Sequence, residues 1–294
     1  MRGPIYSILS AVAFAMMAVL VKLGHLAGGT TADLLQLRFG MAVVILLTLL
    51  LWRDRSALRA SRRTLLRTAF VGVFIYTAQS FFFFRALEDL PASTTALIFY
   101  FYPVAVTLLS AVVFRTRITG TVVLALLLVT SGCGLVFYDA FLKELSAAGM
   151  WYAFGAMAVF SVYLTVCQGL LRGEEPMRMT FYVLLFTAVG FNLALGPSFL
   201  TRLTPQLLGV GVALGVIPTA IAVSLLYKAI ELIGSSRAAI FSTLEPVATL
   251  LAAHWLLGEE VVLLQGAGVA LIVAGIALPN LRLRRKAADL GIST

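Results

Sequence analysis

A stretch built around a proline occurs twice in this chain, and it restricts the possible folds more than any other feature. Residues 85–108 read RALEDLPASTTALIFYFYPVAVTL, and residues 228–251 read KAIELIGSSRAAIFSTLEPVATLL. The two align without a gap at a constant offset of 143 positions. The pairs that match include Arg85/Lys228, Glu88/Glu231, Ser93/Ser236, Ala96/Ala239, Pro103/Pro246 and Leu108/Leu251. We therefore expect two copies of one structural unit.

The residues around this repeat are too apolar for a water-soluble domain. Of the 294 residues, 61% are hydrophobic and 12% are charged, so the apolar side chains could not all be hidden inside a soluble fold. A membrane span needs roughly 20 apolar residues, which predicts about ten spans and no separate soluble domain. The net charge of +9 does not indicate a nucleic-acid partner, since the charges lie between apolar runs rather than in one cluster.

The apolar runs predict an all-α membrane protein with ten transmembrane helices in two repeats of five. The expected spans are 4–24, 33–52, 65–85, 92–114, 118–138, 147–170, 178–200, 206–230, 236–257 and 260–281. The first repeat is expected at 1–140, the second at 146–283 and a cytoplasmic tail at 284–294. Because five is an odd number, the second copy must enter the bilayer from the opposite side, which makes the repeats inverted.

The basic residues predict which end of the protein faces the cytoplasm. With the N-terminus inside, 17 Lys and Arg residues fall on the cytoplasmic side and four on the other, namely Lys22, Arg85, Lys143 and Arg202. Cytoplasmic loops carry the excess of Lys and Arg in membrane proteins. Both termini are therefore predicted to be cytoplasmic.

The sequence lacks the common motifs of catalytic sites. There is no H-E-x-x-H, G-x-S-x-G or phosphate-loop motif, and no aspartate pair within the spans. We expect no enzymatic activity, no catalytic residue, no metal site and no cofactor. The expected partners are a small-molecule substrate and the lipid bilayer, and the oligomeric state stays open, a monomer included.

The two repeated prolines locate a candidate hinge and site. A proline inside a helix lacks an N–H and frees the carbonyl four residues earlier, which is Phe99 for Pro103 and Ser242 for Pro246. Such a carbonyl can accept a hydrogen bond from an ammonium group, or a neighbouring Ser or Thr can satisfy it. Pro218, which follows several glycines, marks either a third hinge or a place of close helix packing.

Three further polar residues fall within the predicted spans. Glu245 is a carboxylate deep in the hydrocarbon, and it serves either a substrate or proton, or a structural hydrogen bond beside the proline. Its equivalent in the first repeat is Tyr102. Arg38 lies about one and a half turns into the second predicted span, where its long side chain either extends to the membrane surface, which we favour, or has a functional role.

One helical stripe combines aromatic and polar side chains. Tyr76, Gln79 and Phe83 are spaced i, i+3 and i+7, and Tyr163 adds another ring from the sixth span. Such groups suit an amphipathic, partly apolar solute, although rings also fill helix interfaces. The expected cavity residues are Tyr76, Gln79, Phe83, Phe99, Tyr102, Tyr163, Ser242 and Glu245, with Pro103, Pro246 and Pro218 as hinges.

The second repeat resembles a known family. The run EPVATLLA from Glu245, Leu257 to Glu259 and the glycines at 266, 268 and 275 are similar to the second EamA repeat of the drug/metabolite transporter superfamily. Leu37-Arg38-Phe39 and the Pro103 region resemble its first repeat. In length and plan the chain is similar to bacterial aromatic amino acid exporters of the inner membrane.

This resemblance implies ten helices, an inverted repeat, a central cavity and export of small metabolites from the cell. It implies that the cavity is built from spans 1, 3, 4, 6, 8 and 9. One departure is that Tyr102-Pro103 and Arg115-Thr116 stand where the second repeat has Glu245-Pro246 and Gly258-Glu259. The carboxylates thus cannot act in both halves, and we expect Glu259 only to cap the last helix.

The leading hypothesis is an inner-membrane exporter of amino acids, aromatic ones included, which works by rocking of the repeats about Pro103 and Pro246. A multidrug or other metabolite exporter of the same superfamily is the alternative. A passive pore and a purely structural membrane protein are less favoured, because proline-containing inverted halves suit alternating access.

Overall fold

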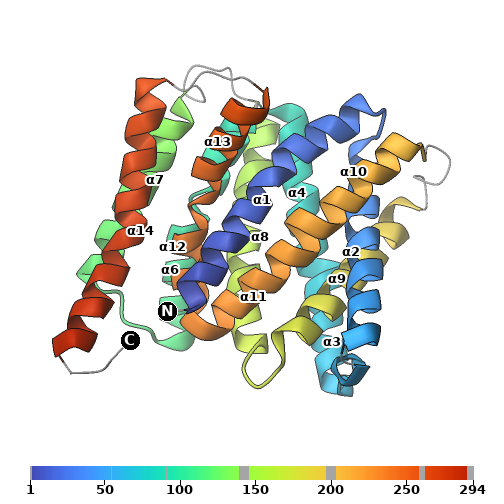
Figure 1. Cartoon of the computed structure of the whole chain (residues 1–294), viewed down its shortest axis with the longest axis horizontal. Helices are drawn as coiled ribbons and strands as arrows, with labels where there is room; N and C mark the ends of the chain where they lie inside the picture. Colours follow the sequence, from blue (N-terminus) through green and yellow to red (C-terminus); the bar gives the residue numbers. More distant parts are fainter. Residues whose placement is uncertain are drawn as a thin grey trace.

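The fold is described by a computed structural model that covers residues 2–53, 55–90, 92–138, 146–196, 203–257 and 262–289. All regular structure in these residues is helical (Figure 1). In chain order the helices are α1 (Arg2–Leu26), α2 (Thr31–Arg53), η1 (Arg55–Leu58), α3 (Arg62–Phe70), η2 (Val71–Tyr76), α4 (Thr77–Asp89), α5 (Ala92–Phe99), α6 (Tyr102–Phe114), α7 (Gly120–Val136), α8 (Ala147–Leu170), α9 (Pro176–Leu195), α10 (Pro205–Gly215), η5 (Val216–Ile221), α11 (Ala222–Ile233), α12 (Ser235–Ser242), α13 (Glu245–Leu257) and α14 (Leu263–Asp289).

The helices have the length and composition of membrane spans, which confirms the predicted all-α class. Among the described residues, seven helical stretches are long and apolar enough to cross a membrane, and two shorter apolar helices are Gly120–Val136 and Leu263–Leu278. Large side chains such as Trp52, Trp151 and Trp255 are mostly exposed, which suits contact with lipid. The crossing number, the inversion and the side of the termini stay predictions.

Both repeated prolines follow a break in the helix. α5 ends at Phe99 and α6 begins at Tyr102, while α12 ends at Ser242 and α13 begins at Glu245. Each break covers two residues, 100–101 in the first repeat and 243–244 in the second. The proline stands at the second position of the new helix, where a missing N–H costs little.

Two other stretches widen into π-helical turns. η2 connects α3 to α4, and η5 connects α10 to α11, so that residues 62–89 and 205–233 each form one continuous helical stretch. η5 contains Pro218. Wider turns of this kind are rare in helices and often lie at functional sites.

Two equivalent glycines bring these stretches close to other helices. A Cβ added at Gly72 would lie 2.6 Å from the Val183 carbonyl oxygen on α9, and one added at Gly215 would lie 2.8 Å from the Ala42 amide nitrogen on α2. Gly72 and Gly215 are separated by the repeat offset of 143 positions. Glycine is required at both places because the neighbouring backbone leaves no room for a side chain.

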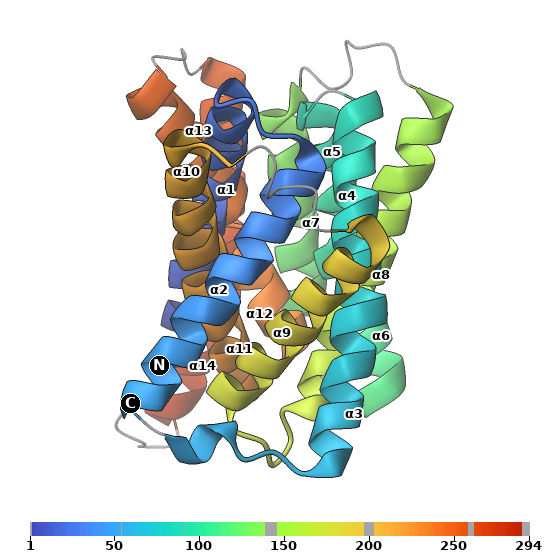
Figure 2. The ribbon, with the colours of Figure 1, turned by 90° about the vertical axis from the view of Figure 1, so that its right-hand side faces the viewer.

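Helix packing follows the same offset across the bundle (Figures 1 and 2). α1 packs on α11, and its equivalent α8 packs on α4, the equivalent of α11. α7 and α14 pair with each other at one side of the bundle. The equivalent glycines Gly132 and Gly275 lie in that contact, against Gly268 and Ala125 respectively.

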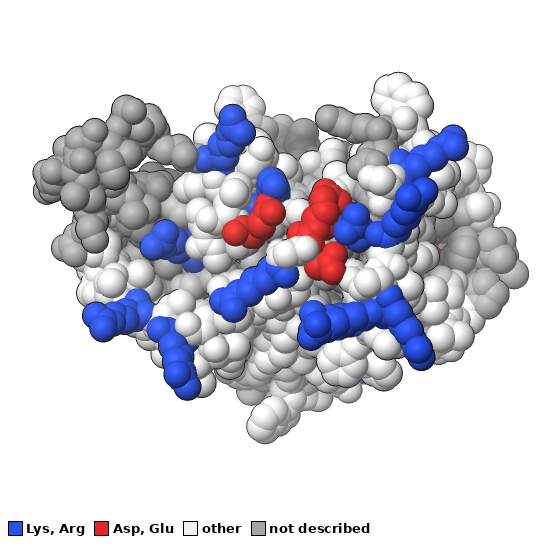
Figure 3. All heavy atoms as spheres, turned by 90° about the horizontal axis from the view of Figure 1, so that it is seen from below, with Lys and Arg blue, Asp and Glu red and all other residues white. Residues whose placement is uncertain are grey.

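Basic side chains are spread over the end of the bundle at which α1 begins. Viewed from this end, Lys and Arg surround a central group of acidic side chains (Figure 3). Glu175 caps α9 by accepting hydrogen bonds from the amides of Met177 and Arg178, and Glu174 accepts one from Thr64 at 2.5 Å. The acidic groups thus have local structural partners, and the surrounding basic groups match the side predicted to be cytoplasmic.

Candidate solute site

A cavity of about 850 Å³ lies between α1, α2, α4, α5, α8, α11, α13 and α14. The deep part of the cavity is lined by Arg38, Tyr76 and Glu245. The part nearer the surface is lined by Lys22, His25 and Leu26, at the end of α1. Leu26 is 77% exposed. The cavity therefore reaches the surface at the end of the bundle opposite the basic face.

Arg38 lies inside this cavity, contrary to the expectation that its side chain reaches the membrane surface. The residue is 4% exposed. Its Nε donates to Thr219 Oγ1 at 2.8 Å, and its Nη2 lies 3.5 Å from the Tyr76 hydroxyl oxygen. The sequence placed Arg38 on a span but could not show that two neighbouring helices turn it inward.

The position of Arg38 depends on the break in hydrogen bonding at Pro218. Pro218 has no N–H for the Leu214 carbonyl, four residues earlier, and Thr219 Oγ1 donates to that oxygen instead at 2.7 Å. A hydroxyl has one proton, so Thr219 must accept from Arg38. Pro218 thus helps to build the Arg38 site. Of the glycines before it, Gly211 and Gly215 lie close to α2, and the hinge role of Pro218 stays a prediction.

Glu245 is the carboxylate of the cavity wall. It is the first residue of α13, where the free amides of a helix start favour a negative charge. Tyr100 lies beside it, and Arg38 is near enough to interact with it electrostatically. Among the described residues, neither Arg38 nor Glu245 is in a salt bridge within 4.0 Å, so the guanidinium and the carboxyl group of the wall are not paired with each other.

Aromatic rings cover much of the remaining wall. Phe99 packs on Phe83 with ring centroids 5.0 Å apart and on Phe160 at 5.1 Å. Tyr76 stacks on Tyr163 at 4.6 Å. All five side chains line the cavity, which gives it flat apolar surfaces next to the two charged groups.

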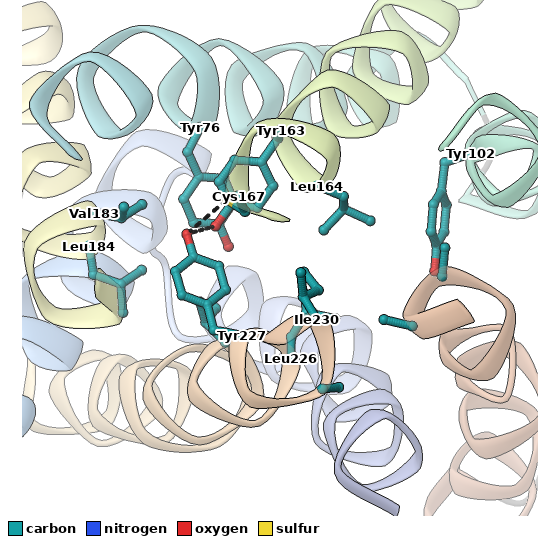
Figure 4. Packing of buried hydrophobic residues seen from close by; sticks show 14 of the residues in the cluster. Tyr76, Tyr102, Tyr163, Leu164, Cys167, Val183, Leu184, Leu226, Tyr227 and Ile230 are labelled. Carbon is teal, nitrogen blue, oxygen red and sulfur yellow. Dashed lines mark hydrogen bonds between the residues drawn. The ribbon is translucent and has the colours of Figure 1, made fainter. Parts of the chain in front are cut away.

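Three tyrosines lie close together at the deep part of the cavity: Tyr76 and Tyr163, which line it, and Tyr227 (Figure 4). Tyr163 on α8 and Tyr227 on α11 share a hydrogen bond of 2.8 Å between their hydroxyl groups, and Cys167 Sγ lies 3.3 Å from the Tyr227 hydroxyl. Tyr227 is completely buried. These contacts join the two helices directly below the open space.

Below the tyrosines, hydroxyl and amide groups connect the helices at the basic end. Gln168 Oε1 accepts from both the amide and the hydroxyl of Ser235 at 2.7 Å. Thr107 Oγ1 lies 2.8 Å from Ser236 Oγ, and Ser110 Oγ lies 2.8 Å from Ser235 Oγ. The cavity is thus open at one end of the bundle and closed at the other.

Most of the residues predicted for the cavity lie on its wall. Tyr76, Gln79, Phe83, Phe99, Tyr163 and Glu245 line it. Tyr102 and Ser242 are not among its lining residues: Tyr102 packs behind Phe99 and Phe160, and Ser242 Oγ lies 3.2 Å from Ser7 Oγ. The sequence could not show that the rings of Phe99 and Phe160 lie against Tyr102, or that Ser242 contacts α1.

The sequence also predicts roles for Pro103, Pro246 and Glu259. The hinge role of Pro103 and Pro246 stays a prediction, although both prolines are buried beside the breaks. The expected cap by Glu259 lies outside the described residues.

Sequence reasoning missed Phe160 and Thr219, and Thr219 could have been found because the offset of 143 positions makes it equivalent to Tyr76.

The sequence relationships agree with this architecture. A profile of the EamA-like transporter family matches residues 1–138 and 147–281. The chain belongs to the EamA-like transporter family, within the drug/metabolite transporter superfamily. It is therefore a multi-pass membrane protein and a transporter.

Two relatives and one solved structure are similar to it. A protein of Archaeoglobus fulgidus named "Uncharacterized transporter" is 29% identical over 276 residues, which is 92% of this chain and 93% of the relative. "Uncharacterized transporter YwfM" of Bacillus subtilis is 26% identical over 199 residues, 67% of each chain. A crystal structure with 21% identity superposes with a TM-score of 0.79 over 96% of this chain and 98% of the other, which supports the fold alone.

Proposed function

We propose that this transporter exports small metabolites, chiefly amino acids and among them aromatic ones, across the bacterial inner membrane by alternating access. The observation that carries the proposal is the cavity of about 850 Å³, whose wall has a buried guanidinium, a carboxyl group and several aromatic rings. This volume falls in the usual range for a small-molecule site, roughly 300–1,000 Å³.

The proposed mechanism uses ten crossings in two inverted repeats, at 1–140 and 146–283, with both termini in the cytoplasm. Its support is that α1 on α11 and α8 on α4 are equivalent contacts, as are those of Gly72 and Gly215. In an inverted pair, exchanging the conformations of the halves opens the other end of the same cavity. The breaks before Pro103 and Pro246 are the proposed hinges, and the present form is the outward-open one.

Amino acids fit the chemistry of the wall. The Glu245 carboxylate suits an ammonium group, and the rings of Phe83, Phe99 and Phe160 suit an aromatic side chain. The same carboxylate and rings would also suit a lipophilic cation, which makes a multidrug exporter the second candidate. The two differ in whether amino acids compete with such cations for transport.

Purified protein in liposomes tests the proposal. Vesicles loaded with unlabelled phenylalanine should accumulate labelled phenylalanine by counterflow, with saturation, and tryptophan and tyrosine should compete. A lipophilic cation such as tetraphenylphosphonium is the comparison solute. Flux of the cation without flux of any amino acid would replace the first candidate by the second, and flux of neither above empty vesicles would contradict both.

A further inference from the structure

Arg38 is a buried cation on the cavity wall, and its hydrogen bonds to the protein use only some of its N–H donors. A guanidinium group has five N–H donors, and the bonds found in the described part of the chain use Nε and Nη2. The side chain lines the cavity while being only 4% exposed. A charge at this depth is costly without a partner, so a position of this kind indicates a functional group and an anion to be bound.

The protein holds this guanidinium in a fixed orientation. Thr219 fixes Nε at 2.8 Å, and Arg38 Cζ lies 4.9 Å from the centre of the Phe39 ring. Tyr76, which contacts Nη2, is itself stacked on Tyr163. A guanidinium held in this way can present its remaining donors to both oxygens of a carboxylate.

Resting on the function proposed above, we propose that Arg38 binds the carboxylate of the transported solute while Glu245 faces its ammonium group. The substrate class is then zwitterionic α-amino acids, and the side chain lies against the rings of Phe83, Phe99 and Phe160. Lys22 does not take this role, because it is an exposed residue at the mouth of the cavity. Arg38, by contrast, lies within electrostatic reach of Glu245.

The first test uses the unmodified protein and analogues that lack one charge. Counterflow of labelled phenylalanine is measured with phenylalanine, phenylalanine methyl ester, phenethylamine and 3-phenylpropionate as competitors. A charge-assisted hydrogen bond changes affinity by about 10- to 100-fold, so we expect the ester and phenethylamine to compete at least about tenfold more weakly than phenylalanine. Equal competition by all four compounds would overturn the proposal.

The second test assigns this selectivity to Arg38. In Arg38→Gln the advantage of phenylalanine over phenethylamine should disappear, and Arg38→Lys should restore part of it. Arg63→Gln, which removes an exposed charge outside the cavity, should match the wild type. If Arg38→Gln keeps the wild-type preference for the carboxylate, the proposal is wrong even though amino acid transport stands.

A binding measurement separates this proposal from the substrate proposal. If the wild type moves no amino acid, thermal stabilisation in detergent is measured with 3-phenylpropionate and with the neutral 3-phenylpropanol, for the wild type and Arg38→Gln. Stabilisation by the carboxylate alone, lost in Arg38→Gln, would support the anion site while the proposed function fails. No difference between the two ligands in the wild type would overturn the anion site as well.

Discussion

Tyr76 and Thr219 occupy equivalent positions in the two repeats, and the side-chain oxygens of both contact the guanidinium of Arg38, at 3.5 and 2.8 Å. Both residues belong to π-helical turns. Arg38 therefore lies between the two halves of the chain, and a relative movement of the halves would change its surroundings. The proposed carboxylate site would therefore respond to the conformational change proposed above.

The contact with Thr219 gives the first prediction. Thr219→Val keeps the shape of the side chain but removes the acceptor for Arg38 Nε and the donor to the Leu214 carbonyl. We expect KM for phenylalanine to rise roughly tenfold, since a hydrogen bond to a charged group is lost. The measurement is concentration-dependent counterflow in liposomes.

A matched threonine provides the control for this variant. Thr48 lies on the exposed side of α2, where its hydroxyl donates to the Val44 carbonyl at 2.8 Å. Thr48→Val should leave KM within about twofold of the wild type. If Thr219→Val behaves like Thr48→Val, then Thr219 does not position Arg38.

The close contact at Gly215 gives a prediction about stability. A Cβ there would lie 2.6 Å from Met41 Cβ and 2.8 Å from the Ala42 amide nitrogen, so Gly215→Ala should destabilise by about 1–3 kcal/mol through overpacking. Gly209, on the same helix, has no atom within 4 Å of an added Cβ. Gly209→Ala should be neutral or stabilising, and equal melting temperatures for the two variants in detergent would contradict the packing described for Gly215.

How much of this could be read from the sequence differs from residue to residue. The offset of 143 positions is visible without a structure, and the stripe Tyr76, Gln79 and Phe83 pointed to the cavity wall because Gln79 and Phe83 lie in the regular helix α4 and Tyr76 directly precedes it. The exact environment of Arg38 could not be read, because its direction depends on contacts with η2 and η5. Tyr102 was misplaced because the sequence does not show that its ring packs on Phe99 and Phe160 rather than lining the cavity.

The proposed hinges give a kinetic prediction. Pro103→Ala or Pro246→Ala restores an N–H that can donate to the carbonyl four residues earlier, in α5 or α12, which would allow the helix to continue across the break. We expect turnover to fall about tenfold or more, which corresponds to about 1.4 kcal/mol, while stabilisation by bound phenylalanine is retained. Turnover and ligand-induced thermal shifts are measured on the same preparations.

Pro205 serves as the control for the hinge variants because it also lies in the first turn of its helix, α10, but follows an extended residue, Thr204, rather than a break between two helices. Pro205→Ala should transport at the wild-type rate. Wild-type turnover in both hinge variants would show that the breaks at Pro103 and Pro246 are not needed for the conformational change.

The central claim, that one cavity opens alternately at the two ends, is tested most directly by locking the closed end. Thr107 Oγ1 and Ser236 Oγ are 2.8 Å apart, so cysteines at both positions should be within reach of a disulfide. The two native cysteines, Cys133 and Cys167, are buried, and the single variants Thr107→Cys and Ser236→Cys control for oxidation elsewhere.

The measurement is phenylalanine counterflow by the double variant T107C/S236C before oxidation, after oxidation and after reduction. The account predicts transport in the reduced protein, arrest on formation of the disulfide and recovery on reduction, with both single variants unaffected by oxidation. Undiminished counterflow after complete formation of the disulfide would contradict alternating access through this end of the bundle.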